Sequence, residues 1–317
     1  MLYKNSLKLI FSNFSLVWKI LLWVLIATSL CLGLCYLVAL PVINLLNTTG
    51  WFLLLRTSYE EFIASYSLTG LVQNLGEVIE VFVKILSVNL SRIWFSIVLF
   101  CILITFVFSF VSGFCFMPMC GALYHSMSSN TKTSFMDNFI VYFKKNLKYS
   151  LFNLLVNLPL RLLCLYLVCK IIVWSNVLSD DLLFLAPSVA CLVYVLLNSA
   201  RITLTSGWVP AQVAMNMGVF SAFIDGVKSA KRRLINTYSN AVGLLISIVF
   251  INMFSLICTF GIGLIISIPF TCVWYATFGM TSYYSSSGLK FYVDSYNIIS
   301  PKKRELSENV SSLKYFI

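Results

Sequence analysis

Six stretches of this sequence are long and apolar enough to cross a lipid bilayer as helices. A spanning helix needs about 20 mostly apolar residues, each adding about 1.5 Å. The stretches are Trp18–Ile43, Ile93–Met117, Leu151–Val177, Leu182–Trp208, Ala241–Phe260 and Gly263–Tyr283. The sequence therefore predicts an all-α, polytopic integral membrane protein with six transmembrane helices.

The composition agrees with lipid as the main solvent of the chain. Of 317 residues, 60% are hydrophobic and only 10% are charged, and the mean hydropathy is +0.92. A soluble globular domain has about 25% charged residues. No polar segment is long enough to form a large water-exposed domain. We therefore expect residues 1–317 to form a single transmembrane domain.

Two of the turns between consecutive spans are very short, "SNVLSDD" at 175–181 and "TFGIG" at 259–263. Short turns join antiparallel neighbours, so spans three and four form one hairpin and spans five and six form another. With spans one and two as the remaining pair, the sequence predicts three antiparallel hairpins. A basic segment with amphipathic character precedes each hairpin: "YKNSLKLIFSNF", "SFMDNFIVYFKKNLK" and "VFSAFIDGVKSAKRRL". The pattern is typical of three copies of an interfacial helix plus a hairpin. The alternative is that any six-span protein with basic inner loops shows this layout.

The basic residues predict the orientation in the membrane. If the spans are correct, the N-terminus, the loops after spans two and four and the C-terminal tail share one side, with sixteen Lys and Arg residues against three on the other. The three are Arg56, Lys84 and Arg92. Cytoplasmic loops carry the excess of Lys and Arg, so both termini should be cytoplasmic. We expect the cell membrane as the location.

Two segments outside the spans have a character of their own. Residues 46–92 form an extracytoplasmic segment, in which apolar residues recur at helical spacing from Leu71 to Ile85. We expect an amphipathic helix there, capping the bundle. Residues 285–317 form a cytoplasmic tail. Aromatic residues at the end of span six, such as Tyr283, Tyr284 and Phe291, predict an interfacial belt.

Polar residues follow a helical stripe on spans three and four. On span three the stripe contains Asn146, Ser150, Asn153, Asn157 and Arg161. On span four it contains Tyr194, Asn198, Arg201, Thr205, Trp208 and Gln212. In an antiparallel pair the two arginines come to a similar depth. No acidic residue lies deep in a span to pair with them.

Two interpretations of these arginines remain open. In the first, both guanidinium groups snorkel to the inner headgroups. In the second, Arg161 and Arg201 bind an anionic group, such as a lipid phosphate or an acidic solute, and the side chains of Asn153, Asn157, Asn198 and Thr205 orient it. Lys170 lies deeper in span three, and neither interpretation explains it.

Seven further basic residues flank the spans and predict contact with anionic headgroups at the membrane surface. They are Lys144, Lys145, Lys148, Lys228, Lys231, Arg232 and Arg233. The net charge of +11 would suggest nucleic acid in a soluble protein. Here the clustering beside apolar spans favours lipid, and we expect no nucleic-acid partner.

Catalytic motifs are missing from the sequence. No Gly-rich phosphate loop occurs, and the only histidine is His125, so we assign no catalytic residue, metal or cofactor. We expect a non-enzymatic, transporter-like protein or an accessory membrane subunit, with membrane or ATPase partners that the sequence does not identify. The alternative is a membrane-embedded lipid-handling protein or enzyme that holds a phosphate through Arg161 and Arg201.

Overall fold

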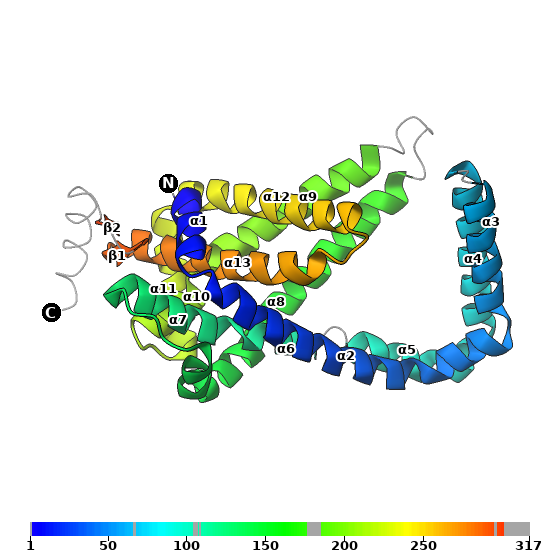
Figure 1. Cartoon of the computed structure of the whole chain (residues 1–317), viewed down its shortest axis with the longest axis horizontal. Coiled ribbons are helices and arrows are strands. Elements are labelled where there is room, and N and C mark those ends of the chain that lie inside the picture. The colour runs from blue at the N-terminus through cyan, green and yellow to red at the C-terminus, as the bar shows by residue number, and fades with distance from the viewer. Residues whose placement is uncertain are drawn as a thin grey trace. The chain divides into compact units, whose positions relative to one another are not determined.

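The computed structural model describes residues 2–65, 68–103, 107, 109–175, 185–294 and 297–300 (Figure 1). Most of these residues are α-helical, and the only strands among them form one short two-stranded sheet, which confirms the all-α prediction. The chain forms two compact units. The larger unit contains Met1–Leu25 and Phe110–Ile317, and the smaller unit contains Ile26–Ser109.

Helix α2 (Ser15–Thr48) begins in the larger unit and continues into the smaller one. The other elements of the larger unit are α1 (Leu2–Ser12), α6 (Ser109–Phe114), α7 (Phe116–Ser129), α8 (Phe135–Ser175), α9 (Leu185–Thr205), α10 (Trp208–Ala214), α11 (Val219–Arg232), α12 (Leu234–Cys258), α13 (Leu264–Ser286), β1 (Phe291–Tyr292) and β2 (Ile298–Ile299). The smaller unit adds α3 (Trp51–Ser65), α4 (Leu68–Val88) and α5 (Leu90–Ile102).

Within the described residues, four helical segments are long and apolar enough to cross a membrane. They are Ser15–Thr48, Ser188–Ala214, Leu234–Cys258 and Leu264–Ser286. A fifth arises if Glu77–Val88 and Leu90–Ile102, which meet at a bend of 107°, count as one span. The predicted spans at 93–117, 151–177 and 182–208 all include residues outside the described part. The chain is thus a helical protein with several helices that are long and apolar enough to cross a membrane. The presence of six spans stays a prediction.

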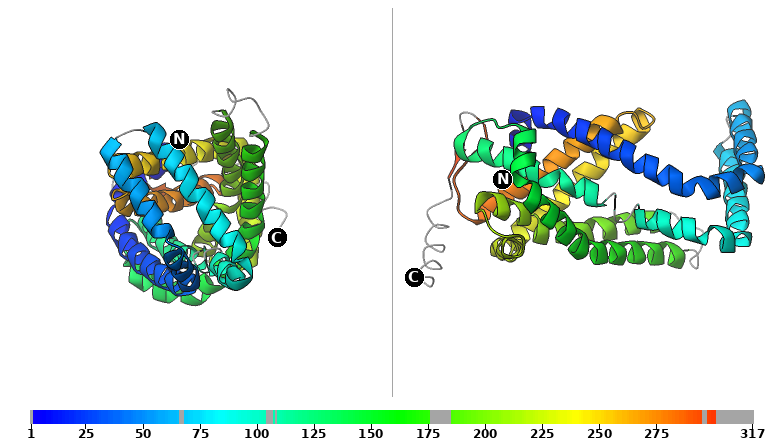
Figure 2. Two further views of the ribbon diagram at one scale, coloured as in Figure 1. Left: turned by 90° about the vertical axis from the view of Figure 1, so that its right-hand side faces the viewer. Right: turned by 90° about the horizontal axis from the view of Figure 1, so that it is seen from below.

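The core of the larger unit lies around α13. Trp274, Phe278 and Tyr283 of this helix are almost fully buried. Helix α1 packs against α13, and the indole Nε1 of Trp274 donates to Ser6 Oγ at 3.2 Å. Helix α12 packs on α13 and also on α9, and α9 packs on α8 (Figures 1 and 2). A continuous layer of helices therefore connects α13 to α8.

The aromatic residues after span six were predicted as a lipid-facing belt, and this prediction is wrong for the inner members. Tyr283, Tyr284 and Phe291 are each at most 3% exposed. Phe291 begins β1, which pairs antiparallel with β2 so that Phe291 lies opposite Ile299. Strand β1 packs on α7, so the first part of the tail belongs to the protein core.

The three predicted amphipathic segments differ in their relation to the following span. The first and third are separate helices, α1 and α11, which end at Ser12 and Arg232 shortly before α2 and α12 begin. The second is continuous with its span in the 41 residues of α8. Helix α11 buries small residues, Ala222 and Gly226 among them, and exposes Phe220. A membrane-surface role for these segments remains a prediction.

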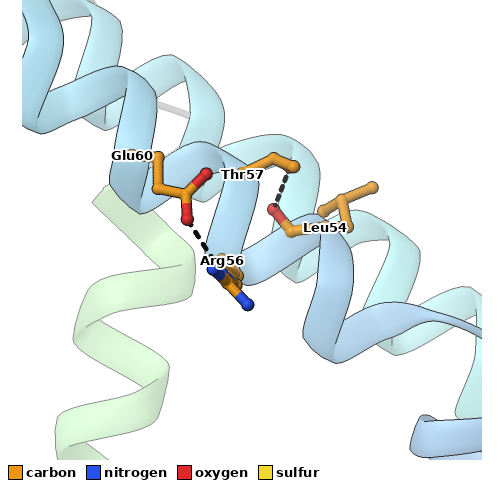
Figure 3. Close-up of polar contacts among 4 residues, drawn as sticks. All are labelled: Leu54, Arg56, Thr57 and Glu60. Atoms are coloured by element: carbon orange, nitrogen blue, oxygen red, sulfur yellow. Dashed lines mark hydrogen bonds and ion pairs between the residues drawn. The ribbon is translucent and has the colours of Figure 1, made fainter.

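The smaller unit contains the predicted extracytoplasmic helix. Helix α4 covers the whole of the predicted range Leu71–Ile85, whereas α3 was not anticipated. The two pack together, and Trp51 Nε1 of α3 donates to the Val78 carbonyl of α4 at 3.0 Å. On α3, Arg56 Nε lies 2.8 Å from Glu60 Oε1, one helical turn away (Figure 3). Both side chains are exposed, so this ion pair adds little stability.

Candidate anion-binding site between α8 and α9

Helices α8 and α9 carry the two predicted polar stripes and pack against each other (Figures 1 and 2). Asn153 and Asn157 lie one turn apart on α8, and Arg201 lies one turn before the end of α9. We call these three residues, together with Tyr149, the α8–α9 polar seam. Because helical spacing repeats every three to four residues, the stripes place these side chains on one face of each helix.

A line of hydrogen bonds connects the members of the seam. The Arg201 guanidinium donates from Nη1 to Asn157 Oδ1 at 3.3 Å. Asn157 in turn donates from Nδ2 to Asn153 Oδ1 at 2.5 Å, and the Tyr149 hydroxyl donates to the same oxygen at 3.4 Å. Asn157 is 4% exposed. The seam therefore links the two helices through neutral amides and one cation.

Arg201 is partly buried and incompletely satisfied. Its Nε is buried without a hydrogen-bond partner. No acidic side chain of the described residues forms an ion pair with it. A buried charge normally needs an opposite charge or several hydrogen bonds. Arg201 thus has the capacity to bind an anionic group.

The direction of the Arg201 side chain can be compared with the two interpretations, snorkelling to the headgroups and binding of an anionic group. A snorkelling side chain extends along its helix to the headgroups, whereas the Arg201 guanidinium reaches across to α8. This geometry favours the second interpretation for Arg201. The Arg161 side chain lies outside the described part of the chain, so the pairing of the two arginines stays a prediction.

The remaining predicted site residues form local contacts. Asn198 donates from Nδ2 to the Tyr194 carbonyl at 3.0 Å and lies 3.7 Å from Cys164 Sγ of α8. The Thr205 hydroxyl donates to the Arg201 carbonyl at 2.9 Å. Asn198 therefore contributes to the contact between α8 and α9, and Thr205 is satisfied by its own helix.

Two further polar residues of α8, Lys170 and Asn146, also form contacts within the larger unit. Lys170, unexplained from sequence, is exposed and places its Nζ 5.7 Å from the ring centroid of Tyr166, four residues earlier on α8. This is the distance of a cation–π contact. Asn146, the first member of the stripe, donates from Nδ2 to the Phe114 carbonyl before α7.

Tyr149 is the member of the seam that the sequence analysis missed. It lies four residues before Asn153, but it is one position off the Asn146–Ser150 stripe that was followed. Its ring packs edge-on against Trp208 of α10, with centroids 5.1 Å apart. The Tyr149 hydroxyl is therefore held between Trp208 and Asn153, to which it donates a hydrogen bond.

The predicted membrane-surface cations lie on α8 and at the end of α11. Lys144, Lys148, Lys228, Lys231 and Arg232 are exposed, and Lys145 and Arg233 are partly buried. Lys145 Nζ donates to Asn216 Oδ1 at 2.5 Å, which ties α8 to the loop before α11. The other cations are placed to contact headgroups if this side faces the cytoplasm. No group of three or more His, Cys, Asp or Glu side chains in the described ranges could hold a metal ion.

The chain matches no protein-family model, no curated protein and no solved structure.

Proposed function

We propose that the chain is a non-enzymatic, six-span protein of the cell membrane, a transporter-like protein or an accessory membrane subunit. Both termini would be cytoplasmic, and the spans would form three antiparallel hairpins. The observation that carries the proposal is the distribution of polarity. Long helices expose large apolar side chains, such as Leu22 on α2 and Phe250 on α12, while amides and hydroxyls lie inside the larger unit.

A water-soluble monomer would not expose so much apolar surface to solvent. Contiguous exposed apolar area beyond a few hundred square ångströms marks a membrane or protein interface. Lipid tails solvate it, while the polar side chains inside bond to each other or to backbone carbonyls. The basic residues on one side then set the orientation.

Membrane extraction and terminal reporters test this proposal. We expect the full chain to stay with the membrane in alkaline carbonate and to require detergent for release. A fluorescent protein fused to the C-terminus should fluoresce, and an alkaline phosphatase fused there should be inactive. Release without detergent, or an active phosphatase fusion, would contradict the proposal.

A second candidate function follows from Arg201. The Arg201 guanidinium points into the α8–α9 polar seam with an unpartnered Nε, which supports a lipid-handling protein or enzyme that binds an anionic headgroup or phosphate. A phosphate oxygen would accept from Nε, while Asn157 keeps the guanidinium plane in position. Arg161 would supply the second cation.

Removal of the charge at position 201 tests this function. In the detergent-purified protein we expect Arg201→Leu to lose co-purified anionic lipid, as measured by native mass spectrometry. Lys170→Leu is the matched control, because it removes a cation of α8 that contacts Tyr166 outside the seam. Equal lipid retention in Arg201→Leu and the parent protein would exclude the anion site at Arg201.

A further inference from the structure

A cavity with two lysines in its lining lies in the larger unit, apart from the α8–α9 polar seam. Its volume is about 300 Å³. Eight residues line it: Asn13, Ser15, Leu16, Lys19, Ala122, Lys132, Thr133 and Ser134. We call it the Lys19–Lys132 pocket. The loop between α1 and α2, the first turns of α2, helix α7 and the loop before α8 all contribute to it.

The charge of this lining is entirely positive. Lys19 and Lys132 come from different elements, and no Asp or Glu belongs to the lining. Lys19 is partly buried and forms no ion pair within the described ranges. Asp137 is exposed in the first turn of α8. Asp294 is outside this lining, but it lines the adjacent cavity together with Lys132 and accepts from the Asn297 N–H at 2.8 Å.

Two hydroxyl groups of the lining already accept a hydrogen bond. Ser134 Oγ already accepts from the Met136 N–H at 3.3 Å, and Thr133 Oγ1 accepts from Asn138 Nδ2 at 2.9 Å. Each hydroxyl retains its own hydrogen for a further acceptor, because a Ser or Thr hydroxyl has one donor and two acceptor positions. Ser15 adds a third hydroxyl. The pocket thus combines two ammonium groups with three hydroxyl donors.

The positions in the chain add a favourable dipole. Helix α2 begins at Ser15 and α8 begins at Phe135, directly after Ser134. Both helices are long, and the N-terminus of a helix favours negative charge. Donors from several directions match a ligand with several acceptor oxygens. A phosphate group fits this description better than a single carboxylate, which offers only two oxygens.

We propose that the Lys19–Lys132 pocket binds a phosphate group, which is carried either by a lipid headgroup or by a free phosphate compound. Lys19 and Lys132 neutralise it, and Ser15, Thr133 and Ser134 donate hydrogen bonds to its oxygens. The pocket belongs to the side predicted to be cytoplasmic, so the inner leaflet and the cytosol are the two sources. The proposal does not depend on Arg201 or on transport activity.

Binding of two probes to the full-length protein in detergent tests the proposal. The probes are inorganic phosphate and a short-chain phosphatidylglycerol, with short-chain phosphatidylcholine as the zwitterionic reference. We expect a thermal stabilisation by at least one of the two anionic probes that exceeds the effect of the reference. Lys19→Gln and Lys132→Gln should each weaken that binding by about tenfold, the loss of one charge-assisted hydrogen bond.

Two control variants separate a specific site from a general effect of charge. Lys8→Gln removes an exposed lysine of α1 outside the pocket and should leave binding unchanged. Lys19→Arg keeps the charge and should retain binding, which shows that a loss in Lys19→Gln is not a folding defect.

Each outcome decides the proposal. Binding of phosphate with the expected lysine dependence supports a soluble phosphate compound, and binding of phosphatidylglycerol alone supports a lipid headgroup. If neither probe binds, or if Lys8→Gln weakens binding as much as Lys19→Gln, the pocket is not a phosphate site.

Discussion

Helices α12 and α13 follow each other in sequence and pack together, yet they occupy opposite environments. In the most apolar 18 residues of α12, 11% are buried, against 61% in α13. Helix α12 exposes Ile246, Phe250 and Ile257. Helix α13 is the less apolar of the two and buries Thr277, Thr281 and Ser286.

This difference is the reverse of the pattern in soluble proteins, where the more apolar helix is the more buried one. In lipid, apolar side chains gain little from burial, so small and hydroxyl residues that permit close packing lie at the helix contacts. Two of these hydroxyls bond to carbonyls of their own helix. Thr277 donates to the Trp274 carbonyl at 2.9 Å, and Thr281 donates to the Thr277 carbonyl at 2.9 Å.

The largest expected effect comes from a charge on the exposed face of α12. Ile246 lies at the middle of the helix and is 54% exposed. If lipid surrounds it, Ile246→Lys should reduce insertion by about 2.5–3.5 kcal/mol, the value for Lys at a helix centre. Membrane-inserted yield measures this, with Ile246→Leu as the control. Normal yield of Ile246→Lys would mean that water contacts this face.

A methyl group at a close contact of α13 should have the next largest effect. A Cβ on Gly279 would lie 2.8 Å from the Ser206 carbonyl oxygen, whereas a Cβ on Gly243 of α12 meets nothing within 4 Å. We expect Gly279→Ala to destabilise the protein by about 1–3 kcal/mol in thermal unfolding in detergent. Gly243→Ala should be neutral or stabilising, because Ala favours the helix. Equal effects of the two changes would contradict the difference in packing between α12 and α13.

Loss of one hydrogen bond to α1 should have a smaller effect. Trp274→Phe keeps an aromatic ring on α13 but removes the donor to Ser6. The Ser6 hydroxyl still donates to the Tyr3 carbonyl at 2.8 Å, so no donor is left unpaired. We expect a loss of about 0.5–1.5 kcal/mol and faster proteolysis of the N-terminal helix. Trp18→Phe, at a 54% exposed indole, is the control.

The smallest effect concerns the contact between α12 and α13 themselves. Ser267 Oγ donates to Asn252 Oδ1 at 2.7 Å. Interhelical hydrogen bonds in membranes contribute about 0.6 kcal/mol on average. Ser267→Ala should therefore lower the unfolding midpoint only slightly more than Ser221→Ala, whose hydroxyl bonds within its own turn. A loss several times larger would show that polar contacts, rather than close packing, hold this pair together.

Part of the candidate site could be predicted from helical spacing, and part depends on contacts between distant segments. Helical spacing was sufficient to predict a polar face on each of two helices, because the period of an α-helix is fixed. Asn153 and Asn157 belong to the face on α8, and Arg201 belongs to the face on α9. It did not indicate Tyr149, whose place depends on Trp208 of α10. The Lys19–Lys132 pocket was not predicted at all, since its lysines are more than a hundred positions apart.

By itself, the sequence determined the class of the protein, because 60% hydrophobic residues in long runs can only be helical in lipid, where each backbone amide must find a partner within its own segment. Only the tertiary structure decided which apolar helix is buried and which aromatic residues belong to the core. The reason is that an apolar helix face can contact lipid tails or protein side chains with little difference in free energy. The choice between them rests on the fit of particular small residues, such as Gly279 against Ser206, which no local pattern records.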